Sequence, residues 1–232
     1  MNVLVCGGAG FIGSEFIRNH LKNNSDSKLT NLDILTIGSN LQNLKNIENN
    51  PNYSFIKENI TNESIIDGIV KDVDVIVNFA AESHVDRSIS NPKPFLETNI
   101  MGTYSILEAV RKYDKKFIHV STDEIYGDAY GQDSFDEESQ INPSNPYAAT
   151  KAAADNLVAS YHRTYGINCI ITRCTNNFGP FQFPEKLIPK TIIRSIKNLK
   201  VPLYGDGTQI RSWIFVNDHV NAIESLISKG KA

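Results

Sequence analysis

The sequence predicts an α/β protein: a doubly wound parallel sheet of the Rossmann type, followed by a smaller, partial C-terminal region. Short runs of β-branched residues alternate with longer helical segments, which is the pattern of parallel strands joined by covering helices. Runs such as VLV, VIV and FIHV have the continuous apolar character of strands that are buried on both faces. The order strand, helix, strand, helix therefore indicates a doubly wound sheet.

The expected elements follow one another along the first three quarters of the chain. The strands are expected at Asn2–Cys6, Lys28–Asp33, Tyr53–Ile60, Asp74–Phe79, Lys116–Ser121 and Asn168–Arg173. The clearest helices between them are Phe11–Asn23, Pro94–Tyr113 and Tyr147–Tyr165. In such a sheet the ligand crevice lies at the carboxyl ends of the strands.

The regular alternation of strands and helices ends near residue 174, where NNFGPFQFP is typical of a loop that leaves the sheet. Beyond it we expect a helix at Lys186–Leu199, a short VPLYG segment, a strand-like RSWIFV and a last helix from about Asn217. That is too little for an independent second domain. We therefore expect a Rossmann domain at 1–173 and an incomplete substrate-binding region at 174–232, whose last helix packs back on the first domain.

Composition excludes several classes of protein. The net charge is only -3, so the chain has no basic field of the kind that selects nucleic acid or an anionic membrane. No apolar run approaches the roughly 20 residues that span a bilayer, and the chain begins with an apolar strand instead of a signal sequence. A cytoplasmic protein is expected. Cys6, Cys169 and Cys174 lack zinc-type spacing, which favours buried structural thiols and predicts no metal site.

A glycine-rich turn follows the first strand and opens the first helix. Its glycines, Gly7, Gly10 and Gly13, form GxxGxxG, and Phe11 and Ile12 lie between the last two. Glycines permit a tight turn and let backbone amides approach a pyrophosphate at the positive end of the helix. Alone, this pattern is as typical of a structural turn as of a nucleotide site, but its position between a strand and a helix favours a dinucleotide site.

Asp33 at the end of the second strand indicates which dinucleotide is bound. It comes 20 residues after Gly13, where a carboxylate can accept hydrogen bonds from an adenosine ribose. The following Ile34-Leu35-Thr36 offers no Arg or Lys for a 2′-phosphate. NAD is therefore favoured over NADP, with a strand-end turn carboxylate as the alternative interpretation of Asp33.

Further residues stand at the carboxyl ends of strands and should line the same crevice. They are Asn59 and Ile60 after the third strand, Ala80 and Ala81 after the fourth, and Ser121 at the end of the fifth. We expect all of them on the cofactor side.

Tyr147 and Lys151 are four residues apart in YAATK and share one face of a helix. A neighbouring ammonium lowers the pKa of a phenol, which makes the tyrosine a usable base near neutral pH. The pattern YxxxK is common by chance, but here it follows the fifth strand of a GxxGxxG protein. In this position the pair resembles that of the extended short-chain dehydrogenases/reductases, and the resemblance covers nearly the whole chain. It implies that Thr122 is the hydroxyl partner that helps to polarise the reacting oxygen.

Asp123 and Glu124 place two carboxyl groups beside that tyrosine. Their run STDEIYG closely resembles the STDEVYG of dTDP-glucose 4,6-dehydratases. A 4-epimerase needs neither carboxyl, whereas a 4,6-dehydratase needs a base for the C5 proton and an acid for the leaving C6 hydroxyl. The alternative is that both residues begin a solvated turn.

The resemblance implies a hydro-lyase that converts dTDP-glucose to dTDP-4-keto-6-deoxyglucose. Tyr147, assisted by Lys151 and Thr122, would take the C4 hydroxyl proton as hydride passes to NAD. Glu124 would then take the C5 proton and Asp123 would protonate the leaving C6 hydroxyl, before hydride returns to C6. The family pattern also usually has Asp, in contact with adenine, where this chain has Asn59.

Four further segments resemble the substrate-binding parts of the same family. They are AAESHVDRS, NNFGP, FPEKLIP and the stretch from Gly205-Asp206-Gly207 to Trp213. The substrate-binding candidates that the resemblance implies are Ser83, His84, Arg87, Asn177, Glu185, Lys186 and Arg211. For His84 a role in loop packing is equally compatible with the sequence, and for Arg211 a surface charge is the alternative.

Three alternatives remain open from the sequence. A UDP-sugar 4-epimerase or a dehydratase for another nucleotide sugar would use the same fold, and the resemblance implies that family members continue beyond the last helix of this chain. A non-catalytic NAD-binding scaffold is therefore a further possibility. The resemblance also implies a homodimer, built from the helices Pro94–Tyr113 and Tyr147–Tyr165.

Overall fold

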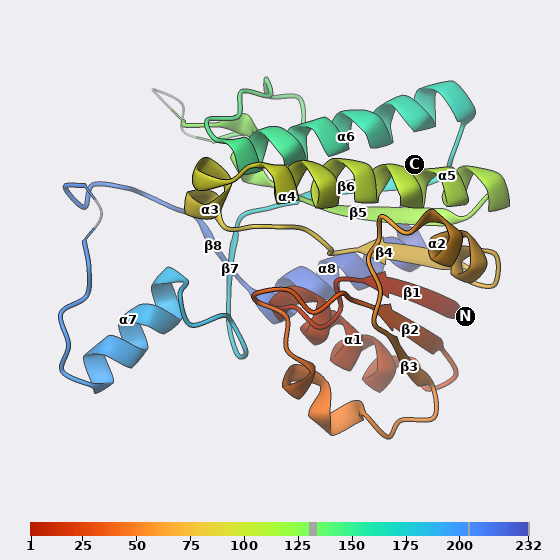
Figure 1. Cartoon of the computed structure of the whole chain (residues 1–232), viewed down its shortest axis with the longest axis horizontal. Helices are drawn as coiled ribbons and strands as arrows, with labels where there is room; N and C mark the ends of the chain where they lie inside the picture. The colour runs from red at the N-terminus through yellow and green to blue at the C-terminus, as the bar shows by residue number, and fades with distance from the viewer. Residues whose placement is uncertain (130–133, 204, 232) are drawn as a thin grey trace.

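The computed structural model describes residues 1–129, 134–203 and 205–231, so Tyr204 of the VPLYG segment and the terminal Ala232 lie outside the described residues. Six parallel strands form one sheet in the order β3-β2-β1-β4-β5-β6 (Figure 1). The strands are β1 (Asn2–Cys6), β2 (Lys28–Leu32), β3 (Tyr53–Ile56), β4 (Val75–Asn78), β5 (Lys116–Thr122) and β6 (Cys169–Cys174). The order reverses between β1 and β4, which confirms the predicted doubly wound Rossmann sheet.

Helices cover both faces of this sheet (Figure 1). On one face, α1 (Phe11–Asn23) and α8 (Val216–Lys229) share a core with the strands, and apolar residues from Phe16 to Ile227 are buried there. On the other face lie α2 (Glu63–Val70), α5 (Thr103–Tyr113) and α6 (Pro146–Tyr165). The last helix of the chain thus packs against the first, on the face of the sheet opposite to α5 and α6.

The predicted helix Pro94–Tyr113 is one helical region with an irregular centre. It consists of α4 (Lys93–Phe95), a π-helical turn η2 (Leu96–Gly102) and then α5. Gly102 packs against the Ile60 side chain, where a Cβ atom would lie 2.3 Å from Ile60 Cδ1. Single π-helical turns often occur at functional sites.

The predicted third strand, Tyr53–Ile60, is wrong in its second half because β3 ends at Ile56. The Asn59 side chain accepts a hydrogen bond from the Thr61 amide at 3.0 Å, which forms a turn in place of the strand. The loop predicted at NNFGPFQFP is also wrong in part. Here β7 (Asn176–Phe178) pairs in parallel with β8 (Trp213–Phe215) in a separate two-stranded sheet.

Short helical turns complete the described structure. They are η1 (Leu41–Ile47), α3 (Val85–Ser90) and η3 (Asp123–Tyr126), and the longer α7 covers Leu187–Ile196. Helix α7 buries none of its residues and stands apart from the six-stranded sheet (Figure 1). None of the helices in the described parts of the chain combines the length and the apolar character that crossing a membrane requires.

Candidate active site

The glycine turn between β1 and α1 packs directly on the loop that follows β4. Gly7 has a positive φ of 78°, and a Cβ atom there would lie 2.5 Å from the Ala80 backbone nitrogen. Gly13 faces the same turn, where a Cβ atom would lie 2.4 Å from the Gly7 carbonyl oxygen. These contacts require glycine at both positions. The close approach of the loops after β1 and β4 therefore depends on Gly7 and Gly13.

Helix α1 begins without a side-chain cap. Its N-cap residue is Gly10, which has no side chain to accept from the first amides, and Phe11 and Ile12 open the helix while partly exposed. Amides in a first helical turn that lack a protein acceptor are the groups that bind phosphate oxygens. This end of α1 is thus suited to the pyrophosphate of a dinucleotide.

Asp33 is buried and holds the glycine turn in place. Its Oδ2 accepts from the Ala9 amide at 3.0 Å, and its Oδ1 accepts from the Leu35 amide at 2.7 Å. The Ser39 hydroxyl also donates to Oδ2, at 3.3 Å. The carboxylate therefore fixes the loops around the expected ribose position, as well as offering acceptors there.

The other cofactor-side candidates lie at the same edge of the sheet. Asn59 uses its side-chain oxygen in its own turn, Ile60 is buried beneath Gly102, and Ser121 is buried at the end of β5. The Ala80 amide donates to the Asn78 side-chain oxygen at 3.1 Å, and Ala81 follows partly buried. The Asn78 side-chain nitrogen is buried without a partner among the described residues. Three features are therefore suited to binding a dinucleotide: the free Asn78 donor, the close approach of the Gly7 and Ala80 backbones, and the uncapped amides of α1.

Tyr147 and Lys151 lie on the first turns of α6, and both are buried. The α6 N-terminus is held by Asn145, whose Oδ1 accepts from the Ala148 amide at 2.9 Å, and by Ser88, whose hydroxyl accepts from the Tyr147 amide at 3.1 Å. Burial, and then the charge of Glu124, raise the pKa of Tyr147. Burial lowers the pKa of Lys151 to about 8. A phenol buried in this way would need a charged ammonium beside it to act as a base.

The predicted carboxyl pair lies on η3, at the mouth of β5. Thr122 caps this turn by accepting from the Glu124 amide at 3.2 Å, and its hydroxyl lies 3.4 Å from Asp123 Oδ1. Burial raises the pKa of Asp123, and burial together with the Asp123 charge raises that of Glu124. Thr122 also acts on the pKa of Tyr147, in the lowering direction. The structure thus places Thr122 between the tyrosine and the two carboxyl groups.

Glu185 connects two of the predicted substrate-binding segments. Its carboxylate is 2.9 Å from Arg87 Nη2 and 3.4 Å from His84 Nε2. Lys186 donates to the Ser83 carbonyl oxygen at 3.4 Å, and burial lowers its pKa. Glu185 is therefore occupied by two protein side chains in this structure, while Lys186 reaches towards Glu124, whose charge acts on its pKa.

Asn177 is buried and pairs with the last helix. Its Oδ1 lies 2.8 Å from His219 Nδ1, and its Nδ2 donates to the Thr175 carbonyl oxygen at 2.9 Å. Burial lowers the pKa of His219 to about 4, so this histidine is neutral near pH 7. The side-chain amide of Asn177 therefore joins β7 to α8.

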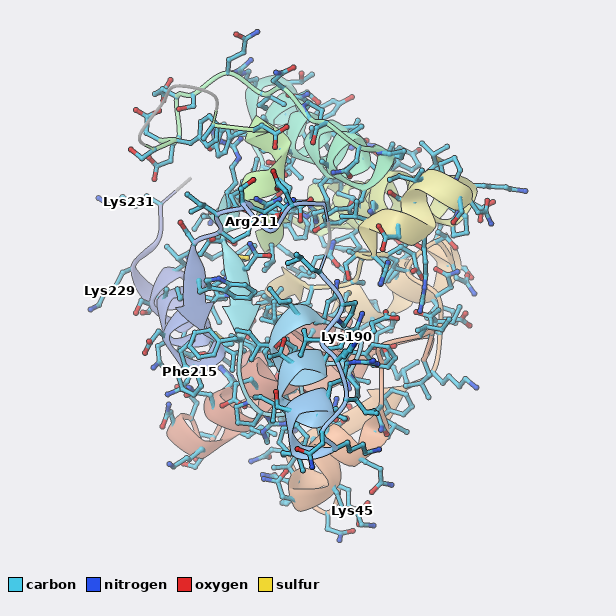
Figure 2. All side chains as sticks on the ribbon, turned by 90° about the vertical axis from the view of Figure 1, so that its left-hand side faces the viewer. Lys45, Lys190, Arg211, Phe215, Lys229 and Lys231 are labelled. Carbon is cyan, nitrogen blue, oxygen red and sulfur yellow. The ribbon has the colours of Figure 1, made fainter. Side chains whose placement is uncertain are left out.

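Arg211 is exposed in the segment before β8, on the face that carries α7 (Figure 2). Its charge acts on both Asp123 and Glu124 in the direction that lowers their pKa values. The same segment is attached to β7 by Thr175, whose hydroxyl donates to the Ser212 carbonyl oxygen at 2.8 Å. Arg211 is thus a long, exposed cation whose charge acts on the carboxyl pair.

Sequence reasoning missed several residues that act on these groups. Asn145 Nδ2 donates to Glu124 Oε2 at 3.5 Å, and the Thr175 side chain acts on the pKa of Asp123 in the lowering direction. Asn99 in η2 donates to the Glu82 carbonyl oxygen at 3.1 Å and to the Thr150 hydroxyl at 2.9 Å. Asn145 stands directly before the Pro that opens α6, which is a cap signal in the sequence. For Thr175 and Asn99 the sequence carries no such signal.

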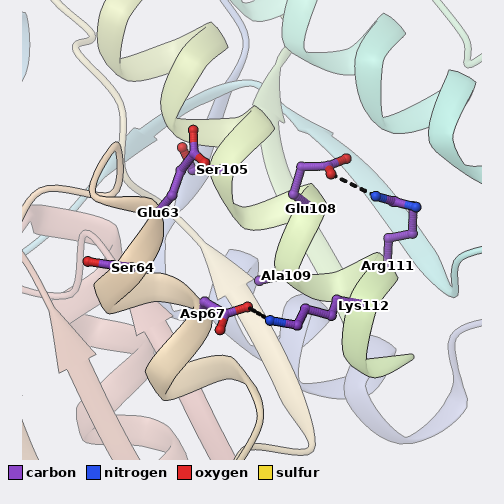
Figure 3. A pocket seen from close by; sticks show the side chains of 8 residues that line it. All are labelled: Glu63, Ser64, Asp67, Ser105, Glu108, Ala109, Arg111 and Lys112. Carbon is purple, nitrogen blue, oxygen red and sulfur yellow. Dashed lines mark hydrogen bonds and ion pairs between the residues drawn. The ribbon is translucent and has the colours of Figure 1, made fainter.

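A hollow between α2 and α5 contains none of these residues (Figure 3). Most of its lining residues are polar or charged; Asp67 of α2 pairs with Lys112 of α5 at 2.7 Å, and Glu108 pairs with Arg111 along α5 at 2.8 Å. Among the described residues there is also no cluster of three His, Cys, Asp or Glu side chains that could hold a metal ion. The residues suited to chemistry are those at the carboxyl ends of the strands.

A doubly wound sheet with a glycine turn, a Tyr-Lys pair and a carboxyl pair defines an enzyme of the extended short-chain dehydrogenase/reductase class. The chain belongs to the GDP-mannose 4,6 dehydratase family, whose model matches residues 4–232. It is 48% identical to the low-salt glycan biosynthesis protein Agl12 of Haloferax volcanii, over 99% of this chain and 74% of that protein. It is 46% identical to the dTDP-glucose 4,6-dehydratase of Escherichia coli, over 99% of this chain and 69% of that enzyme.

Solved structures agree with these relatives. The dTDP-glucose 4,6-dehydratase of Streptomyces venezuelae with NAD and TYD bound matches with a TM-score of 0.94 and 42% identity, over 100% of this chain and 73% of that chain. The UDP-glucuronic acid 4-epimerase of Bacillus cereus has the same TM-score of 0.94 but only 30% identity, over 99% of this chain and 74% of that chain. The fold is thus shared by both kinds of enzyme, and the sequence is more similar to the dehydratases.

Proposed function

We propose that this protein is an NAD-dependent nucleotide-sugar 4,6-dehydratase that converts dTDP-glucose to dTDP-4-keto-6-deoxyglucose. The observation that carries the proposal is the pair of adjacent carboxyl groups on η3, both with raised pKa values, beside Tyr147 and Lys151. A 4-epimerase requires no such acid and base, because its reaction leaves C5 and C6 unchanged. The higher identity to dTDP-glucose 4,6-dehydratases than to a 4-epimerase supports the same choice.

NAD would be held by the glycine turn, the uncapped end of α1 and Asp33. When bound, it would accept hydride from C4 of the sugar and return hydride to C6. The full set of cofactor-side residues in this proposal is Gly7, Gly10, Phe11, Ile12, Gly13, Asp33, Asn59, Ile60, Ala80, Ala81, Ser121, Tyr147 and Lys151. Because Asp33 is followed by no Arg or Lys in the next three residues, NAD is favoured over NADP.

Each reacting side chain has one role in the proposed reaction. Tyr147, which the Lys151 ammonium and the Thr122 hydroxyl activate in this proposal, takes the proton of the C4 hydroxyl as C4 becomes a ketone. The ketone acidifies C5, and Glu124 takes the C5 proton. Asp123, whose raised pKa keeps a carboxyl group protonated to higher pH, gives its proton to the leaving C6 hydroxyl, which departs as water.

The substrate lies, in this proposal, between η3 and the segments that carry Ser83, His84, Arg87, Asn177, Glu185, Lys186 and Arg211. Lys186 and Arg211 are the cations whose charges already act on Glu124, so they are suited to a diphosphate next to the sugar. The side chains of Asn177 and Glu185 hold protein partners instead, and we assign them to the arrangement of this binding region. We divide the chain accordingly into a cofactor domain at 1–173 and a sugar-nucleotide region at 174–232.

We further propose a cytoplasmic homodimer. Leu96, Met101 and Tyr165 are large apolar side chains exposed on the helical layer formed by η2, α5 and α6. A second copy of this layer would bury them in a four-helix interface. The three cysteines are free, as is usual for proteins of a reducing compartment. Light scattering of the purified protein measures the dimer, and a monomer at micromolar concentration contradicts it.

The function is tested by incubating the protein with NAD and dTDP-glucose and measuring the base-induced absorbance of a 4-keto-6-deoxy sugar. We expect that Glu124→Gln abolishes this product while NADH still forms in the first turnover, because oxidation at C4 precedes removal of the C5 proton. Glu48→Gln, at an exposed glutamate, is the matched control. A C4 epimer as product contradicts the proposal, as does NAD binding without measurable affinity for any dTDP- or UDP-sugar in calorimetry.

A further inference from the structure

A group of ionisable side chains lies near the Lys151 ammonium, and the proposed reaction does not use it. Asp155 lies one turn after Lys151 on α6 and is 1% exposed, and His119 of β5 is fully buried. Arg173 stands near the end of β6 with its guanidinium against Asp155. Charges are rarely kept in such a position unless they are paired or have a function.

Arg173 fixes the Asp155 carboxylate. Its Nε donates to Asp155 Oδ2 at 3.0 Å, and its Nη1 donates to the Tyr126 hydroxyl at 2.8 Å. The second oxygen of the carboxylate, Oδ1, has no hydrogen-bond partner among the described residues. That oxygen is 3.6 Å from His119 Nε2, on the side of the lysine.

Lys151 is held by β5 on its other side. Its Nζ donates to the Val120 carbonyl oxygen at 2.8 Å and lies 3.4 Å from His119 Nε2. The ammonium and the carboxylate oxygen thus both lie beside His119 Nε2, without a direct ion pair between Lys151 and Asp155 among the described residues. At this spacing Asp155 acts on the lysine through its charge.

Asp155 is the ionised neighbour that opposes the effect of burial on Lys151. Burial lowers the pKa of Lys151, and the Asp155 charge acts in the opposite direction. The other groups that face the ammonium are neutral near pH 7. Burial raises the pKa of Cys174 to about 11, and burial lowers that of His119 well below its ordinary value. Burial also raises the pKa of Asp155, whereas the charges of Lys151 and Arg173 lower it.

We propose that Asp155, fixed by Arg173, is a positioning residue of the reaction: its carboxylate keeps Lys151 protonated and in place beside Tyr147. The inference rests on the proposed function, because it explains how the tyrosine of that reaction stays activated. It concerns a side chain that touches neither the sugar nor the cofactor and that acts only through Lys151.

The first test is the pH dependence of NADH formation in a single turnover with dTDP-glucose, for the wild-type protein, Asp155→Asn and Asp155→Glu. Loss of the Lys151 proton ends activity on the alkaline side, so a lower pKa of Lys151 moves that limb to lower pH. For Asp155→Asn we expect a rate about tenfold lower at pH 8.5 and nearly unchanged at pH 6.5, which corresponds to a shift of about one pKa unit. Asp155→Glu should restore the wild-type profile. A uniform loss of rate at every pH overturns the proposal, because it indicates a structural role only.

A second test needs no activity and separates this inference from the proposed function. The pKa of Lys151 is read from the NMR titration of its side-chain 13Cε signal, assigned with Lys151→Arg. It should fall in Asp155→Asn, and also in Arg173→Met, which removes the group that keeps Asp155 ionised. Arg173→Lys is the matched control, and Arg173→Met serves as the test if Asp155→Asn does not fold. An unchanged Lys151 pKa in a folded variant overturns the inference, whereas a wild-type protein that forms no 4-keto-6-deoxy sugar contradicts only the proposed function.

Discussion

On the cofactor side of the crevice the chain packs against itself through its backbone, whereas on the substrate side part of the site, including Arg211, comes from exposed segments. Gly7 and Gly13 leave no room for a side chain, and Asp33 holds three groups of the surrounding loops. In contrast, α7 buries no residue, and the segment that carries Arg211 has an Ile210 side chain that is 88% exposed. The same crevice is thus built in two different ways.

This difference indicates how function and stability are connected in each part. On the cofactor side the residues that should bind NAD also connect strands β1, β2 and β4, so a substitution there changes the fold and the site together. On the substrate side a charged residue can be lost without opening the core, because it covers no buried surface. Substitutions should therefore lower the melting temperature on one side and the catalytic efficiency on the other.

The largest effect is expected for Gly7→Ala. The positive φ costs about 1–2 kcal/mol for a residue with a Cβ atom, and a contact of 2.5 Å with the Ala80 backbone adds overpacking of about 1–3 kcal/mol. We expect a large fall in melting temperature and loss of NAD binding, measured by calorimetry. Gly38→Ala is the matched control, because Gly38 also has a positive φ but nothing lies within 4 Å of its Cβ position. Equal destabilisation by the two changes argues against close packing at the turn.

Arg211→Gln should have a smaller effect, confined to activity. Removal of one charge-assisted contact to a diphosphate costs about 1.5–3 kcal/mol, or roughly 10- to 100-fold in kcat/KM. The melting temperature should stay unchanged because the side chain is exposed. Arg163→Gln, at an exposed arginine of α6, controls for the loss of charge. A clear fall in the melting temperature of Arg211→Gln contradicts the expectation that substitutions on the substrate side change activity alone.

The sequence was sufficient for the sheet and for most of its helices. Periodic apolar patterns located five of the six strands to within two residues at either end, because strands buried on both faces have little freedom in composition. The pairing of β7 with β8 could not be predicted in the same way. These strands have three residues each and are 35 residues apart along the chain, so neither carries a period of its own.

The residues of the candidate site likewise divide into those that local sequence patterns predict and those whose roles depend on the fold. The glycine turn, the Tyr147–Lys151 pair and the carboxyl pair are local patterns, and their spacing along the chain was enough to find them. The roles of Asn145, Thr175 and Asp155 depend on contacts between distant segments, such as the bond from Arg173 to Asp155. Such contacts appear only after the strands have brought the segments together.

Asn145 lies where the cofactor side and the substrate side meet. Among the substitutions predicted here, its replacement should change stability and activity least. Its Oδ1 caps α6 on the side of the sheet, and its Nδ2 donates to Glu124 on the side of the substrate. The bond lowers the pKa of Glu124, against the effect of burial. Without it the pKa of Glu124 should rise. Since Glu124 must be deprotonated to take the C5 proton, the acid limb of the rate should then move to higher pH.

Two variants separate the functions of Asn145. Asn145→Ser keeps an oxygen for the cap and loses the bond to Glu124, so activity should fall by up to roughly tenfold on the acid limb with an unchanged melting temperature. Asn145→Ala loses both and should also be destabilised by about 1 kcal/mol. Product formation between pH 5 and 8 and thermal unfolding measure the two effects. If the serine and alanine variants share the shifted pH profile and do not differ in stability, Asn145 acts on the site alone, and the α6 cap does not contribute.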